Sequence, residues 1–181
     1  QHLVNQVLAR HGYSGVMSLV IGDVAEVGER LIADSRIPLV SATGSCRMGR
    51  RVAQVVAGRF GRSLLELGGN NALIVMDDAN LDLALRAIVF GAVGTTGQRC
   101  TTTRRVLVHR SVSETLTQRL IAAYRQLRIG DPLDGQTLVG PLIDGDAVAT
   151  MQRALVAIGE QGGEILYGGE LLDDGEFGAG H

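Results

Sequence analysis

The residues of this chain best suited to covalent chemistry are a cysteine and a glutamate. Cys100 lies among small, polar and cationic neighbours, in the stretch 97–102 that reads Gly-Gln-Arg-Cys-Thr-Thr, after an apolar run typical of a helix. The thiolate is the nucleophilic form of cysteine, and Arg99 and the start of a following turn could both favour it. The alternative is a small side chain that only packs in the interior. This stretch alone is compatible with a nucleophile and with a packing residue.

Glu66 is the candidate partner of that cysteine. It stands within an otherwise apolar strand end, in the stretch 65–69 that reads Leu-Glu-Leu-Gly-Gly. Burying a carboxylate costs free energy unless it is paired with a cation or holds a proton. Such an environment suits a general base that works near neutral pH. The alternatives are a glutamate paired with an arginine and a glutamate that faces solvent.

Two turns from an apolar run into a helix pattern are candidates for anion binding. Residues 43–49 read Thr-Gly-Ser-Cys-Arg-Met-Gly, and residues 22–28 read Gly-Asp-Val-Ala-Glu-Val-Gly. A glycine there lets the backbone approach a ligand, and the first N–H groups of a helix attract anions. Ser45 could instead cap the helix by accepting from those groups. Neither turn is a P-loop, because no Gly-Lys-Ser/Thr follows.

The elements that must position these residues alternate between helix and strand. The apolar spacing predicts helices over 3–10, 24–32, 45–60, 81–93, 112–127 and 146–161, and strands over 16–21, 38–40, 64–67, 72–76 and 105–109. We expect residues 16–21 to be a strand buried on both faces, because the run is continuously apolar. We also expect Phe60 on the apolar face of its helix. The alternation predicts an α/β fold with a parallel sheet, followed after a joint at residues 68–71 by a second α/β unit.

Composition narrows the class of protein. Of the 181 residues, 45% are hydrophobic and 20% charged, which is typical of a folded globular protein. The net charge of −2, with no basic block, argues against nucleic acid or a membrane surface as a partner. No apolar run approaches the ~18–20 residues of a membrane span. We expect no metal centre.

The two cysteines, Cys46 and Cys100, cannot form a disulfide framework, so we expect a reduced, cytoplasmic compartment. The chain opens without the pattern of a signal peptide. It does not begin with Met and it ends in Gly-Ala-Gly-His. We therefore expect it to be an internal piece of a longer protein.

Taken together, these motifs resemble the NAD(P)-dependent aldehyde dehydrogenase superfamily. Glu66 precedes Cys100 by 34 residues, and the turn at 43–45 is similar to the cofactor turn of that family. Residues 68–72, 92–102 and 128–132 resemble its family 7 branch, the α-aminoadipic semialdehyde dehydrogenases. The resemblance covers essentially the whole chain. It implies part of a Rossmann-like dinucleotide-binding domain over residues 1–68 and part of a catalytic domain over residues 69–181.

The resemblance also implies a role for each candidate residue. Cys100 would attack an aldehyde to form a thiohemiacetal, hydride would pass to NAD or NADP, and Glu66 would activate the water that hydrolyses the resulting thioester. The N–H of Cys100 would be one oxyanion donor. Arg99 would hold a substrate carboxylate, as in α-aminoadipate semialdehyde, although pairing with a protein carboxylate is the alternative. The positions that would line the dinucleotide site are Gly28, Gly44, Ser45, Met48, Gly49, Leu67 and Gly68.

Some positions depart from the family pattern. Val24 stands where the family usually has glycine, and Cys46 where a small hydroxyl residue is commoner; we expect Cys46 to be buried as a small side chain. Residues 176–179, Glu-Phe-Gly-Ala, are superficially similar to a downstream family element but come too early to be equated with it.

The resemblance implies a small-molecule aldehyde as substrate, a homo-oligomeric complete protein (a dimer or tetramer), and no aldehyde turnover by this chain alone. The alternatives are a CoA-acylating semialdehyde dehydrogenase, which typically lacks the base at the position of Glu66, and a non-catalytic relative.

Overall fold

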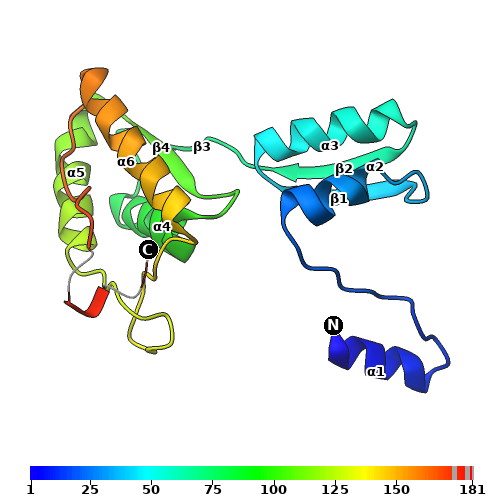
Figure 1. Cartoon of the computed structure of the whole chain (residues 1–181). Helices are drawn as coiled ribbons and strands as arrows, with labels where there is room; N and C mark the ends of the chain where they lie inside the picture. The colour runs from blue at the N-terminus through cyan, green and yellow to red at the C-terminus, as the bar shows by residue number, and fades with distance from the viewer. Residues whose placement is uncertain (173–174, 178–179, 181) are drawn as a thin grey trace. The chain divides into compact units, whose positions relative to one another are not determined.

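The computed structural model describes residues 1–172, 175–177 and 180 of the chain (Figure 1). It divides into two compact units, Gln1–Leu67 and Gly68–His181, each of which contains one pair of parallel strands. The predicted α/β class with parallel strands is confirmed. Residues 178 and 179, part of the Glu-Phe-Gly-Ala stretch, lie outside the described residues.

The first unit is built on the parallel strands β1 (Leu39–Gly44) and β2 (Arg62–Leu67). Their register pairs Thr43 with Glu66 and Gly44 with Leu67, so the two strands end side by side. The helix α3 (Cys46–Gly58) connects them and packs on the sheet. The residues at the centre of this core are Ile32, Val40, Val52 and Val56.

Three helical segments precede β1. They are α1 (His2–Arg10), the π-helical turn η1 (Val24–Gly28) and α2 (Glu29–Ala33). The η1 turn begins where the Asp23 carboxylate accepts a hydrogen bond from the Glu26 N–H at 2.6 Å. The helices predicted over residues 3–10 and 24–32 are confirmed.

Residues 16–21 differ most from the prediction. They form no strand, and their side chains face solvent, with exposed fractions of 64% for Val16 and 84% for Ile21. A strand buried on both faces needs neighbouring strands at its edges and helices over its faces. Within the described residues, β1 pairs only with β2, so this segment has neither. The prediction of a buried strand here is wrong.

Phe60 is a second correction. The helix α3 ends at Gly58, and Phe60 lies beyond it with a positive φ of 59° and 98% of its surface exposed. Its expected place on the apolar helix face is wrong, because the chain turns before the residue could join that face.

The second unit is built on β3 (Asn71–Val75) and β4 (Thr103–Val108). The register pairs Asn71 with Thr103 but Ala72 with Arg105, so the pairing is irregular at the start of β3. The helices α4 (Leu81–Val93) and α5 (Arg110–Tyr124) pack against the strands. The core residues are Val75, Ile88 and Leu116, each at most 3% exposed.

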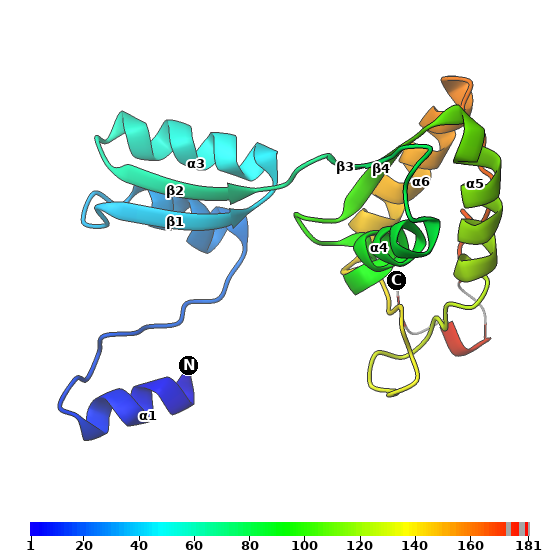
Figure 2. The same ribbon diagram turned by 180° about the vertical axis from the view of Figure 1, so that it is seen from behind.

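A third helix, α6 (Gly145–Glu160), lies in front of the strands of this unit in Figure 1 and behind them in Figure 2. Two short 3-10 segments, η2 (Gly94–Gly97) and η3 (Gly175–Phe177), complete it. The three helices and two strands predicted for this part of the chain are confirmed, with ends shifted by up to three residues. Among the described residues, no helix combines the length and apolar character needed to cross a membrane.

Candidate active site

Cys100 is exposed, in a turn that connects η2 to β4. The turn is hydrogen-bonded to itself: the Thr102 N–H donates to the Arg99 carbonyl at 3.2 Å, and the Arg99 N–H donates to Thr102 Oγ1 at 3.0 Å. Thr102 is only 4% exposed, so the turn is anchored on a buried side chain. The alternative of a buried packing cysteine does not fit this position.

The backbone that leads into the turn is strained. Residues 95–97 have φ values of 54°, 54° and 69°, in the left-handed region that β-branched threonine rarely adopts. For Thr95 and Thr96 this conformation costs roughly 1–3 kcal/mol per residue and persists only where surrounding contacts enforce it, whereas Gly97 adopts it freely. Here Thr96 Oγ1 donates to the Gly140 carbonyl at 3.0 Å, and Gln98 Oε1 accepts from the Ile143 N–H at 3.0 Å. The segment around residue 140 therefore helps to hold the approach to Cys100.

Asn71 provides a further anchor that the sequence analysis missed. Its Nδ2 donates to the carbonyl of Cys100 at 2.7 Å and to that of Thr102 at 3.0 Å. In the sequence, Asn71 is only one position of the stretch 68–72 that resembles family 7. Nothing in the sequence indicates that its side chain meets carbonyls 29 and 31 residues later.

Arg99 is half-buried, and its side chain contacts residues of the same unit. Its Nε donates to Thr95 Oγ1 at 2.9 Å, and the guanidinium carbon lies 5.3 Å from the centre of the Phe90 ring. That distance is within the range of a cation–π contact. No ion pair joins Arg99 to a carboxylate in the described part of the chain. Its contact with a substrate carboxylate stays a prediction.

Glu66 lies one residue before the end of β2, in the first unit, and is exposed. Within the first unit its side chain therefore faces solvent, which was one of the alternatives left open by the sequence. Its role as general base stays a prediction.

The turn from β1 into α3 is the candidate cofactor turn. Ser45 Oγ accepts a hydrogen bond from the Met48 N–H at 3.1 Å, so Ser45 caps the helix. Met48 folds back over Gly44, where an added Cβ would lie 2.6 Å from its Cε. Gly44, Ser45 and Arg47 are exposed, so the start of this 13-residue helix is open to an anion. Cys46 is also exposed, so the expectation that it is buried is wrong.

Gly49 and Leu67 have a clear packing role. Gly49 is buried in α3, and a Cβ added to it would lie 2.4 Å from Leu67 Cδ2. The glycine therefore lets α3 lie close to the end of β2. Contact of either residue with a dinucleotide stays a prediction.

Gly28 closes η1, and Gly68 is an exposed residue at the start of the second unit. Next to Gly28, Glu29 receives two hydrogen bonds from Arg51, at 3.0 and 2.8 Å, which link α2 to α3. The side-chain hydrogen bond from Arg51 lowers the pKa of Glu29 from its ordinary value. This pair fixes the end of η1 relative to the helix of the cofactor turn.

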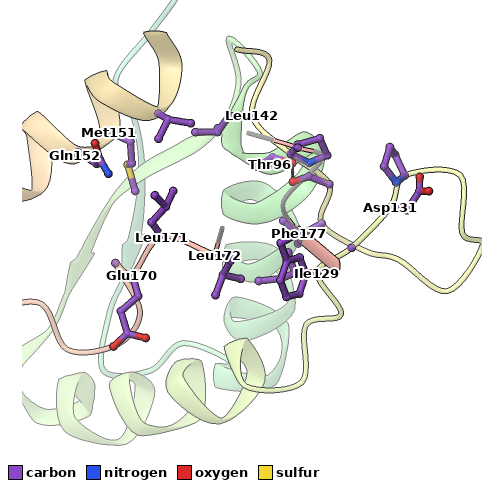
Figure 3. A pocket seen from close by; sticks show the side chains of 18 of the residues that line it. Thr96, Ile129, Asp131, Leu142, Met151, Gln152, Glu170, Leu171, Leu172 and Phe177 are labelled. Atoms are coloured by element: carbon purple, nitrogen blue, oxygen red, sulfur yellow. Dashed lines mark hydrogen bonds between the residues drawn. The ribbon is translucent and has the colours of Figure 1, made fainter. Parts of the chain in front are cut away.

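The second unit also contains a cavity of about 700 Å³ that the sequence did not predict. It lies between α6, the loop around residues 129–142 and the chain near residue 171. Figure 3 shows Ile129, Met151, Leu171 and Phe177 among the apolar side chains that line it. Among the described residues, Cys100 and Arg99 are not part of its wall, whereas Thr96 and Gly140 are. Within the part of the chain described, no cluster of His, Cys, Asp or Glu could hold a metal ion.

The sequence and the fold of this chain were compared with those of known proteins. The family model described as "Aldehyde dehydrogenase family" matches residues 7–180. Aldehyde dehydrogenase family 7 member A1 of Brassica napus is 46% identical over 176 residues, which cover 97% of this chain and 36% of that protein. The alpha-aminoadipic semialdehyde dehydrogenase of Mus musculus is 43% identical over 171 residues, covering 94% of this chain and 32% of its own.

Among solved structures, betaine aldehyde dehydrogenase from Staphylococcus aureus in complex with NAD+ matches with a TM-score of 0.91 and 28% identity. The match covers 98% of this chain and 35% of that one. HpcC from Thermus thermophilus matches with a TM-score of 0.86 and 34% identity, covering 93% of this chain and 33% of its own. The chain spans about a third of the length of the relatives it matches.

Proposed function

Because the chain belongs to the aldehyde dehydrogenase family, we propose that the complete protein oxidises an aldehyde to the corresponding acid with NAD as hydride acceptor. The observation that carries this proposal is Cys100, a thiol on an exposed turn that is hydrogen-bonded on both sides. NADP is the alternative acceptor. We also propose that the two units are the incomplete dinucleotide-binding and catalytic domains of this fold.

The chemistry assigned to Cys100 begins with attack of its Sγ on the aldehyde carbon. A C–S bond forms and the carbonyl oxygen becomes an oxyanion, to which the N–H of Cys100 donates. In the described residues that N–H has no acceptor of its own. Bound NAD supplies the acceptor for the hydride that leaves the same carbon, and a thioester on Cys100 remains.

Glu66 is proposed to complete the cycle. Its carboxylate takes a proton from water, and the resulting hydroxide adds to the thioester carbonyl. The C–S bond then breaks, which releases the acid and returns the thiolate of Cys100. Solvent exposure of Glu66 in the first unit is compatible with access to water.

The residues of the β1–α3 turn fit the diphosphate of a dinucleotide. Gly44 is exposed beside Met48, and the first N–H groups of α3 lie at the positive end of the helix dipole. Ser45 would act chiefly through its cap, since it holds the helix start in place. Gly49 and Leu67 would act through close packing of helix and strand. Gly28, Met48 and Gly68 complete the proposed surroundings of the cofactor.

The substrate proposed is an aldehyde that also carries a carboxylate, such as α-aminoadipate semialdehyde. The family 7 relatives support this choice, and so does the arginine next to the nucleophile. Within the described residues, Arg99 donates a side-chain hydrogen bond only through Nε, to Thr95 Oγ1, so its Nη groups remain as donors for a carboxylate. The complete protein is proposed to be a homo-oligomer, and this chain alone is proposed to be inactive.

The proposal is tested by comparing Cys100→Ser with Cys46→Ser in the complete protein, because both cysteines are exposed. NADH formation should vanish with Cys100→Ser and persist with Cys46→Ser, while NAD binding measured by calorimetry stays within about twofold in both. Survival of oxidation in Cys100→Ser would contradict the proposal. A product that requires CoA, identified by mass spectrometry, would indicate acyl transfer to a thiol instead of water.

A further inference from the structure

We propose that Asn71 is a positioning residue for Cys100. The side-chain amide of Asn71 fixes the direction in which the thiol and the backbone N–H of Cys100 point. The proposal deepens the function proposed above and rests on it, because it assumes that Cys100 is the nucleophile. Asn71 acts through the main chain of the turn, because its side-chain amide donates to two carbonyls there.

The contact is a double one. The Asn71 Nδ2 donates to the Cys100 carbonyl at 2.7 Å and to the Thr102 carbonyl at 3.0 Å, so one amide holds the carbonyls on both sides of Thr101. Asn71 is itself half-buried, at the irregular start of β3. The backbone beside it is fastened to the neighbouring strand, since Arg105 Nη2 donates to the Asn70 carbonyl at 2.8 Å.

These bonds determine the backbone of Cys100 because peptide units are planar. The unit that precedes Cys100 contains the Arg99 carbonyl, which the Thr102 N–H holds at 3.2 Å. The unit that follows contains the Cys100 carbonyl, which Asn71 holds. With both planes fixed, φ and ψ of Cys100 are fixed, and the thiol retains only rotation about its Cα–Cβ bond.

The same geometry orients the oxyanion donor. In a trans peptide the N–H points opposite to the carbonyl of the same unit. The Arg99 carbonyl faces the inside of the turn, where the Thr102 N–H meets it, so the Cys100 N–H points outward. Loss of the Asn71 amide would release the following plane and let Cβ and N–H drift relative to each other.

Asn71→Ala and Asn71→Asp test the role of the amide donor, with Asn70→Ala as the matched control. Aspartate keeps the size of asparagine, but its carboxylate oxygen cannot donate and would face two carbonyl oxygens. The side chain of Asn70, one residue away, makes no hydrogen bond within the described residues. Replacing it should leave the turn intact.

The first measurement is amide hydrogen exchange of this chain, resolved by NMR. The Arg99 and Thr102 N–H groups should exchange about tenfold faster in both Asn71 variants and unchanged in Asn70→Ala. The amides of α5 serve as the folding control and should not change. Unchanged exchange at Arg99 and Thr102 in a folded Asn71→Asp would overturn the proposal.

The second measurement is steady-state kinetics of the complete protein. We expect kcat for aldehyde oxidation to fall about 10- to 100-fold in both Asn71 variants, with KM for aldehyde and NAD within about twofold. An equal loss in Asn70→Ala, or full activity in Asn71→Asp, would overturn the proposal. If the unmodified complete protein oxidises no aldehyde, the proposed function fails, and the exchange measurement alone decides whether Asn71 holds the turn.

Discussion

Replacing Gly49 by alanine should separate the packing role of this residue from the intrinsic preference of a helix. Gly49 is buried in α3, and a Cβ built on it would lie 2.4, 2.6 and 3.1 Å from three side-chain carbons of Leu67. Gly58, the last residue of the same helix, has no atom within 4 Å of such a Cβ. The two glycines therefore differ mainly in what surrounds them.

The two substitutions should change the stability of α3 in opposite directions. Alanine in place of glycine stabilises a helix by up to about 1 kcal/mol, and this gain applies to Gly58→Ala. At Gly49 the added methyl group must displace Leu67, and overpacking costs about 1–3 kcal/mol. We expect Gly49→Ala to be less stable than the unchanged chain by about 1 kcal/mol. In a Leu67→Ala background, where the obstacle is removed, the same substitution should stabilise α3.

The change in the stability of α3 can be measured in the 181-residue chain by hydrogen exchange of peptides from α3, with peptides from α4 as internal reference. A difference of about 1.4 kcal/mol corresponds to a tenfold change in exchange, so the two alanine variants should be clearly resolved. If Gly49→Ala protects α3 from exchange as much as Gly58→Ala does, close packing against Leu67 does not require glycine at position 49.

Three further predictions concern stability and titration. Ser45→Ala should destabilise α3 by about 1 kcal/mol and Ser45→Gly by a few tenths, measured by the same exchange experiment, because the Oγ cap of the Met48 N–H is lost. Leu116→Ala, at a position 1% exposed, should cost about 2–5 kcal/mol and lower the midpoint of thermal unfolding of the second unit. The side-chain hydrogen bond from Arg36 lowers the pKa of Asp34 from 3.8 to about 2, so this pair stabilises the folded state fully above pH 3.8 and is lost as the pH falls through about 2. An NMR titration of Asp34 should show that midpoint, and Arg36→Ala should raise it toward 3.8.

The sequence predicted best the elements whose boundaries are local. The helix α4 begins and ends at the predicted residues, 81 and 93. Asn80 Oδ1 accepts from the Leu83 N–H at 3.0 Å and caps its start, and a glycine follows its end. Such signals involve residues three or four positions apart, and they can be recognised without knowledge of the tertiary structure.

Features that depend on distant partners could not be predicted in the same way. Residues 16–21 have the apolar pattern of a buried strand, but a strand forms only where another strand supplies its hydrogen bonds. Cys100 and Glu66 were identified from residue type, spacing and family resemblance. The Asn71 contact and the left-handed backbone at residues 95–97 follow from tertiary geometry that no sequence motif records.

We propose that, in the complete protein, Cys100 carries the acyl group during turnover and Glu66 promotes its removal. The most direct test is to mix the complete protein bearing Glu66→Gln with a carboxylate-bearing aldehyde and NAD, quench it in acid, and map the adduct by peptide mass spectrometry. We expect one acyl group per chain, joined through a thioester to the peptide that contains Cys100, while the Cys46 peptide stays unmodified. An acyl group on Cys46, or turnover at the unmodified rate with no acyl group on Cys100, would contradict it.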